Sequence, residues 1–182
     1  MKAESRGYKN LSQELITKAL LMLLEEHSYN QISITEITKK ASVARRTFYL
    51  NYSSKQAVLE RYFDILFLDF MDSLNQAAAA DLHSKALVYF KFWENRMSFV
   101  KILEENQLFE LLIKKYSEKL SDQDYFNSFE DLGKKFTAKE LKIMILFNAA
   151  GLWKMLEYWA LNDQQESAEE MAILFCKIVK ND

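Results

Sequence analysis

Residues 33–58, SITEITKKASVARRTFYLNYSSKQAV, decide the fold of the N-terminal part of the chain. Ser33 and Glu36 have the spacing of a capping box, which predicts the start of a short helix. The helical pattern breaks at residues 42–43 and resumes at Ala44, and Ser53-Ser54 favours the start of a third helix. The stretch therefore predicts two short helices joined by a tight turn, with a longer helix after them, which is the pattern of a helix-turn-helix unit.

The second short helix has two chemically different faces. Three side chains recur at i, i+4 and i+8 and are predicted to face inward: Ala44, Phe48 and Tyr52. The opposite face carries Arg45, Arg46 and Tyr49, and residues 41–52 contain no acid. Arginine donors match the O6 and N7 acceptors of guanine and the oxygens of phosphate, so this helix is predicted to enter the major groove of DNA.

The composition of the chain favours an all-α fold. The sequence has 182 residues, of which 49% are apolar, with no proline and only three glycines, so a β-rich fold would lack turn residues. An apolar stripe predicts a first helix from about Leu11 to residue 26, capped by Asn10 or Ser12. After the long helix that begins at residue 53, further helices are predicted at 84–95, 97–119, 122–132, 137–161 and 166–180.

The charge balance differs between the two ends of the chain. Residues 1–60 carry a formal charge of +3 and residues 61–182 a charge of −5, for a net charge of −2. This split places a polyanion contact near the N-terminus. The single cysteine, Cys176, excludes an intramolecular disulfide, and no signal peptide or membrane span is predicted, so we expect a soluble cytoplasmic protein.

Catalytic and metal-binding patterns are not found in the sequence. It contains no glycine-rich phosphate loop, no HExxH motif and no GxSxG motif. His27 and His83 are far apart and lie near predicted helix ends, where a surface or capping role is the simpler explanation. We therefore expect a protein that is not an enzyme and that holds no metal or cofactor.

Residues 34–59 resemble the DNA-binding segment of the tetracycline-repressor (TetR) family of bacterial transcription regulators. The matching positions are Ile34, Ile37, Ala41, Val43, Thr47, Phe48, Tyr49, Ser54, Lys55 and Val58. Residues 147–175 also resemble the last two helices of one subgroup of regulatory domains in this family. Ser42 departs from the family pattern, because it replaces the turn glycine and must adopt the turn conformation at a cost of roughly 1 kcal/mol.

The resemblance implies an all-helical homodimer with a helix-turn-helix domain at residues 1–55 and a regulatory and dimerisation domain at residues 56–182. Such a dimer binds a near-palindromic operator in double-stranded DNA, most often as a repressor that a small molecule releases. The expected DNA-contacting residues are Thr35, Ala44, Arg45, Arg46, Thr47, Tyr49, Asn51, Tyr52 and Lys55. Lys55, at the start of the next helix, is expected to hold a phosphate.

Two further sites are expected in the C-terminal part of the chain. An apolar or aromatic effector would lie among Phe63, Phe67, Phe70, Phe90, Trp93, Phe99, Phe109 and Trp153, although the same residues suit an ordinary core. The dimer interface is expected to include Phe147, Ala150, Gly151, Trp159, Met171 and Phe175. The alternative is a helical co-regulator or protein-interaction module that keeps the fold and acts through its C-terminal surface.

Overall fold

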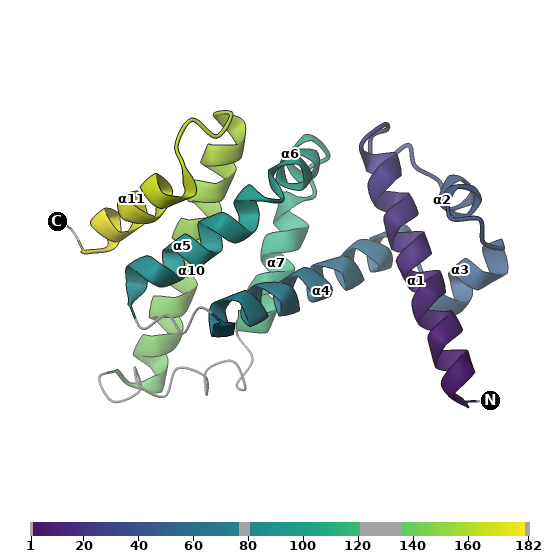
Figure 1. Ribbon diagram of the computed structural model, residues 1–182, viewed down its shortest axis with the longest axis horizontal. Helices are drawn as coiled ribbons and strands as arrows, with labels where there is room; N and C mark the ends of the chain where they lie inside the picture. The colour runs from purple at the N-terminus through teal and green to yellow at the C-terminus, as the bar shows by residue number, and fades with distance from the viewer. Residues whose placement is uncertain (1, 77–80, 121–135, 181–182) are drawn as a thin grey trace. The chain divides into compact units, whose positions relative to one another are not determined.

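The computed structural model describes residues 2–76, 81–120 and 136–180, with side chains from residue 11 onward (Figure 1). All regular secondary structure in these ranges is α-helical, which confirms the predicted fold class. The helices are α1 (Lys2–Leu24), α2 (Ile34–Lys40), α3 (Arg45–Asn51), α4 (Lys55–Gln76), α5 (Leu82–Glu94), α6 (Met97–Glu105), α7 (Phe109–Leu120), α10 (Ala138–Leu161) and α11 (Ala168–Lys180). None of the described helices is long and apolar enough to cross a membrane.

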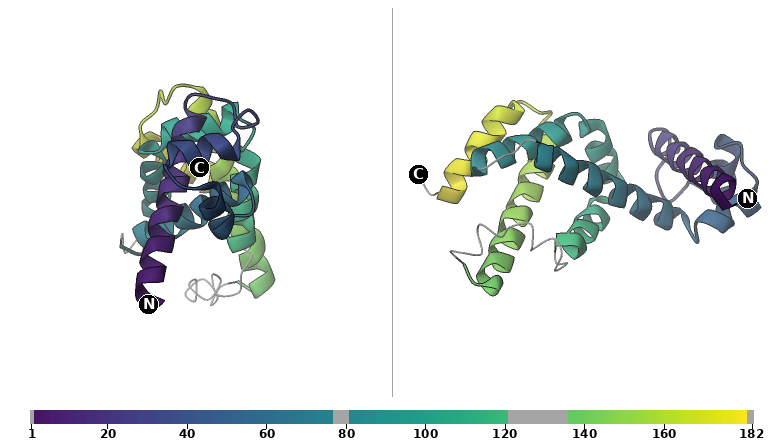
Figure 2. Two further views of the ribbon diagram at one scale, coloured as in Figure 1. Left: turned by 90° about the vertical axis from the view of Figure 1, so that its right-hand side faces the viewer. Right: turned by 60° about the horizontal axis from the view of Figure 1, so that its bottom comes forward.

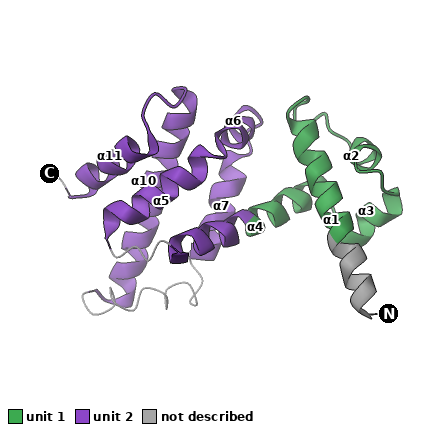
Figure 3. Ribbon diagram, viewed as in Figure 1, with its two compact units in different colours: residues 1–65 green, residues 66–182 purple. Residues whose placement is uncertain are grey.

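The chain divides into two compact units, residues 1–65 and residues 66–182 (Figure 3). The division lies within α4, whereas the expected boundary at residues 55/56 lies at the first residue of that helix. The functional boundary therefore stays a prediction.

In unit 1, α1, α2 and α3 pack against one another around a common core (Figure 2). The buried side chains of this core include Ile16, Leu20, Ile37, Phe48, Val58, Leu59 and Phe63. The predicted capping box at the start of α2 is confirmed: Ser33 Oγ accepts a hydrogen bond from the Glu36 amide at 3.2 Å, and the Glu36 carboxylate accepts one from the Ser33 amide at 2.8 Å. Helix α1 begins at Lys2, well before the predicted caps at Asn10 or Ser12.

The turn between α2 and α3 lies where the helical pattern breaks, and it has the conformation that the family resemblance implies for residue 42. Ser42 has a φ of 54°, in the left-handed region that favours glycine. The Val43 amide donates to the Thr38 carbonyl at 3.0 Å, and the Ser42 amide donates to the Lys39 carbonyl at 3.2 Å. These bonds satisfy the last carbonyls of α2 and redirect the chain into α3 within four residues.

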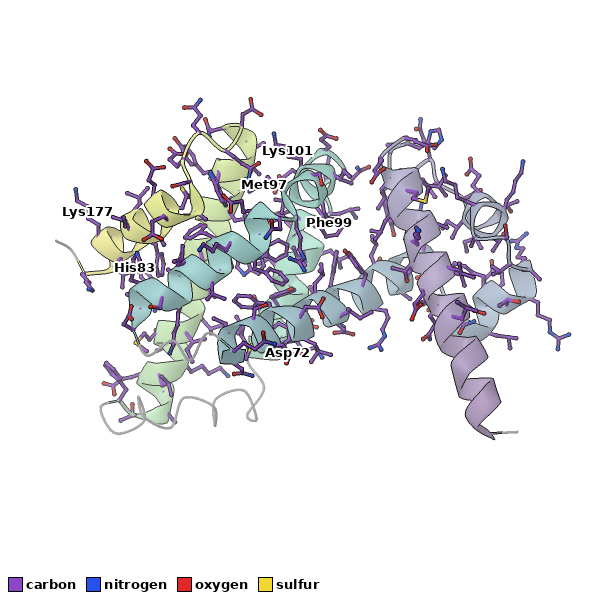
Figure 4. The ribbon with its side chains drawn as sticks, in the orientation of Figure 1. Asp72, His83, Met97, Phe99, Lys101 and Lys177 are labelled. Atoms are coloured by element: carbon purple, nitrogen blue, oxygen red, sulfur yellow. The ribbon has the colours of Figure 1, made fainter. Side chains whose placement is uncertain are left out.

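In unit 2, α5 and α11 pack side by side, and α10 contacts α6, α7 and α11. His83, near the start of α5, lies with its Nε2 3.1 Å from the Glu169 carboxylate of α11, and Lys101 of α6 donates to Asp163 at 2.8 Å (Figure 4). At the connection between α10 and α11, the indole N–H of Trp159 donates to the Glu166 carbonyl at 2.9 Å.

The single helix predicted over residues 97–119 is wrong, because the chain forms two helices there, α6 and α7. Gln107 has a φ of 57°, and the Leu108 amide donates back to the Leu103 carbonyl at 2.7 Å, which ends α6. Leu108 is buried, so the turn places an apolar side chain in the core of unit 2. The helix predicted over residues 122–132 lies outside the described residues.

Candidate nucleic-acid interface

The inner side of α3 is held by aromatic packing. Phe48 is completely buried and Tyr52 almost so, with their ring centroids 6.0 Å apart. The Tyr52 hydroxyl lies 3.4 Å from the Thr17 hydroxyl of α1. This burial confirms the predicted inner face for both residues and argues against the expected DNA contact by Tyr52, because a buried ring cannot reach a base edge.

Ala44 does not share that inner face, so its predicted inward orientation is wrong. It is the N-cap of α3, with an extended backbone (φ −69°, ψ 146°), and its side chain is exposed. The helical period of Phe48 and Tyr52 does not extend to a residue that precedes the first helical turn. Ala44 therefore lies on the outside, where its expected DNA contact stays a prediction.

The outward face of α3 carries two exposed arginines. Arg45 Nη2 lies 3.4 Å from the Tyr49 hydroxyl, and its guanidinium carbon is 5.7 Å from the centre of the Tyr49 ring. Arg46 is exposed and has no intrachain partner among the described residues. Tyr49 is half-exposed and packs edge-on against Phe48, with ring centroids 5.5 Å apart. The two cations and the phenol therefore face solvent from a helix whose position is fixed from behind.

Two further residues expected to contact DNA help to close the end of α3. The Asn51 side-chain amide donates to the Thr47 carbonyl at 2.8 Å, and both side chains are half-buried. This bond holds the Asn51 side chain against its own helix. Thr35 is exposed on α2. DNA contacts by these three residues stay predictions.

Lys55 is engaged within the protein rather than free to hold a phosphate. Its ammonium donates to the carbonyls of Tyr29 and Ile32, the latter at 2.8 Å, and lies 4.3 Å from the centre of the Tyr29 ring. Partial burial lowers the pKa of Lys55, against a smaller opposite effect of the Glu36 carboxylate. These contacts tie the start of α4 to the loop between α1 and α2, which favours a positioning role over the expected phosphate contact.

Leu50 is a further outward residue that the sequence argument missed. Its side chain is 70% exposed on the same helix as Arg46, which lies one turn before it. The sequence contains a signal for this exposure, because Leu50 is two residues from both Phe48 and Tyr52 and so lies on the opposite side of the helix. An apolar side chain on an otherwise cationic face gives α3 two kinds of contact to offer.

Comparison with known proteins identifies this unit. Residues 16–62, which include α2, α3 and the turn between them, match the family described as bacterial regulatory proteins, tetR family. The helix-turn-helix part of the chain is therefore similar to proteins of the TetR family. The matched residues lie within unit 1.

Individual relatives extend the comparison beyond these residues. One curated relative is the HTH-type dhaKLM operon transcriptional activator DhaS of Lactococcus lactis subsp. lactis (strain IL1403), 26% identical over 99 residues, which are 54% of this chain and 46% of that protein. The match thus spans about half the length of that relative.

Two solved structures share the fold. One is titled dihydroxyacetone kinase operon activator DhaS (TM-score 0.60, 18% identity, 93% of this chain and 94% of that chain), and the other is the fatty acid degradation regulator FadR from Bacillus halodurans (0.62, 21%, 90% and 91%).

In unit 2, most residues expected to line an effector pocket belong to one packed aromatic cluster. Trp153 is its centre, with ring centroids 5.5 Å from Trp93, 5.8 Å from Tyr89, 5.9 Å from Phe109 and 5.1 Å from Tyr116. The cluster continues to Phe67, Phe70 and Phe90. Phe99 is half-buried on α6 (Figure 4), and Phe63 lies in unit 1. The described rings fill the space between the helices as a core does, so an effector site among them stays a prediction.

The residues expected at the dimer interface separate into exposed and buried groups. Phe147 is 73% exposed, and Ala150 and Gly151 are also exposed on α10. In contrast, Trp159, Met171 and Phe175 are buried within unit 2, which argues against their predicted role because they have no surface to offer a partner. The exposed apolar residues that the sequence argument missed are Ile143, Tyr158, Leu161, Ile173, Leu174 and Ile178.

Proposed function

We propose that the chain is a dimeric, sequence-specific, DNA-binding transcriptional regulator. The observation that carries the proposal is the outward face of α3, where Arg45, Arg46, Tyr49 and Leu50 are exposed and no acid is present. The buried Phe48 and Tyr52 hold the helix from behind. A helix fixed in this way can present donors to the major groove without an ordering cost at the moment of binding.

The two arginines have different roles in this proposal. Arg45 is already oriented by Tyr49, so its guanidinium and the Tyr49 hydroxyl suit a pair of contacts to one stretch of phosphate backbone. Arg46 has no competing intrachain partner among the described residues and is free to donate two hydrogen bonds to a guanine. Arg46 is therefore the residue on which base recognition depends most.

The proposed dimer forms through the apolar stripe of α10 and α11. Along α10 the stripe follows one helical face through Ile143, Phe147, Ala150 and Leu161, all exposed, and the exposed Lys154 interrupts it. At Gly151 an added Cβ would lie 4.0 Å from Phe175, an ordinary contact, so packing inside the subunit does not require glycine there. Small residues at this point allow a partner helix to approach closely. The proposed partner for the stripe is the same stripe of a second subunit, because a two-fold interface pairs the same surface on both subunits.

Repression that a small apolar or aromatic molecule relieves is the proposed mode of control. Such a molecule would have to separate rings of the unit 2 cluster that now lie in edge contact. Since the lactococcal relative is named as an operon activator, the test of function must detect both signs of regulation.

The test is a binding assay with full-length protein and the DNA upstream of its own gene, at several salt concentrations. Wild-type protein should bind saturably, with an affinity that falls as salt rises. Arg46→Ala should weaken binding to the operator by about 1–3 kcal/mol and reduce its preference over unrelated DNA. Lys91→Ala, which removes an exposed positive charge from α5, is the matched control and should leave affinity unchanged.

Two results would contradict the proposal. One is wild-type protein that does not bind in a salt-dependent, saturable way, which would favour a co-regulator acting through its C-terminal surface. The other is an Arg46→Ala variant with wild-type affinity and preference, which would exclude α3 as the recognition helix. A reporter gene placed behind the operator then gives the sign of regulation.

A further inference from the structure

Leu50 has an unusual position for a large apolar side chain. It is 70% exposed, more than any other large hydrophobic residue described in unit 1. The core positions beside it are taken by Phe48 and Tyr52, both buried, so no rotation of α3 could bury Leu50 without exposing them. A single exposed leucine is ordinary on a protein surface. The residues around Leu50 are what indicate a function for it.

Those surroundings are the face proposed to enter the major groove. Arg46 lies one helical turn before Leu50, and Tyr49 and the exposed Ala44 belong to the same outward side. Once α3 is in the groove, Leu50 loses most of its contact with water. It then needs an apolar partner, because each buried methylene or methyl group contributes about 0.8 kcal/mol only when it leaves water for an apolar contact.

The edges of the base pairs in the major groove offer one apolar group, the C5-methyl of thymine; the other groups there are hydrogen-bond donors and acceptors. We infer that Leu50 contacts the C5-methyl group of a thymine in each half of the operator and is a specificity-determining residue of this chain. This inference rests on the proposed function, because it requires that α3 enters the groove.

The helix geometry also places this thymine relative to the contact of Arg46. Four residues of α-helix advance by about 6 Å. Successive base pairs are about 3.4 Å apart. Where α3 follows the groove, the thymine lies within about two base pairs of the guanine that Arg46 contacts.

The experiment removes single methyl groups from the DNA. The operator is first defined by footprinting full-length wild-type protein on the DNA upstream of its gene. Each thymine is then replaced in turn by deoxyuridine, which differs only in lacking the C5-methyl. One position in each half-site should weaken wild-type binding by about fourfold, the loss expected for one buried methyl group. The same substitution should have no effect on Leu50→Ala, whose own affinity should be lower on the unmodified operator.

Leu68→Ala is the matched control, because Leu68 is also an exposed leucine, at 58%, but lies on α4 in unit 2. It should show the same deoxyuridine penalty as wild type. Thermal unfolding of all three proteins should coincide, since both side chains are exposed. The inference is overturned, with the proposed function intact, if wild-type protein binds its operator specifically but no deoxyuridine position weakens it, or if Leu50→Ala keeps the full penalty. Failure of wild-type protein to bind any DNA specifically would instead overturn the proposed function and this inference together.

Discussion

The outward faces of α3 and of α10 are opposite in chemistry. Helix α3 has seven residues and presents Arg45, Arg46 and Tyr49 to solvent, with aromatic rings behind them. Helix α10 has 24 residues and presents an apolar stripe, with Phe147 as its most exposed large apolar side chain. A cationic face suits a polyanion, and an apolar face suits a surface like itself.

The difference also concerns the cost of exposure. The exposed arginines of α3 are well hydrated in the free protein and lose water only on binding. The exposed residues of α10 are unfavourable in the free chain, and burying them stabilises an association directly. The comparison therefore assigns DNA recognition to the face of α3 and dimer assembly to the face of α10. Each assignment can be tested by substitutions on its own helix.

The largest expected effect is on assembly. Phe147→Glu should weaken self-association on the order of 100-fold, because a two-fold interface would bury the new carboxylate twice. Sedimentation velocity over a range of protein concentrations measures this change. Lys142→Glu, an exposed position on α10 outside the stripe, should leave association unaffected. If the two variants associate equally, the apolar stripe of α10 is not the dimer interface.

The second prediction concerns the frame that holds α3. Lys55→Met should lower the free energy of unfolding by about 1–3 kcal/mol, because the Tyr29 and Ile32 carbonyls lose their charged donor. Chemical denaturation followed by far-UV circular dichroism measures the loss, with Lys39→Met at an exposed position as control. DNA affinity should fall with no change in its salt dependence. A variant of full stability whose salt slope falls by about one would instead show that Lys55 contacts a phosphate.

The smallest effect compares one turn from each unit. Ser42 and Gln107 are both exposed and both have a positive φ, so glycine at either position should relieve strain. Each substitution should raise the free energy of unfolding by about 0.5–1 kcal/mol, since the relief exceeds the added entropy of the unfolded chain. Thermal denaturation measures both. A destabilised Ser42→Gly beside a stabilised Gln107→Gly would show that the serine side chain itself supports the turn in unit 1.

The sequence predicts the structure best where residue types recur at a clear helical or capping spacing. The capping box of Ser33 and Glu36, the turn at Ser42 and the burial of Phe48 and Tyr52 all followed from spacing. The engagement of Lys55 could not be predicted in this way, because its partners are backbone carbonyls far away in the chain.

In α10 and α11 the limitation was different. Residues 143–159 are apolar on almost every side, so no period separates the core from the surface. The sequence therefore predicts an interface role for Trp159 and Met171, although the three-dimensional packing buries both side chains. The exposed Leu174 and Ile178, which look equally suited to a core, lie outside. Only contacts between helices distant in sequence could settle which side of these two helices faces inward.

The distribution of tryptophan allows the fluorescence of unit 2 to be observed separately from that of unit 1. Trp93, Trp153 and Trp159 are the three tryptophans of the chain, and all three are buried in unit 2. Light at the long-wavelength edge of protein absorption excites tryptophan and not tyrosine, so it excites unit 2 alone, since unit 1 has no tryptophan. A shift in tryptophan emission when a DNA fragment is added would report a change in the part of the chain that does not carry α3.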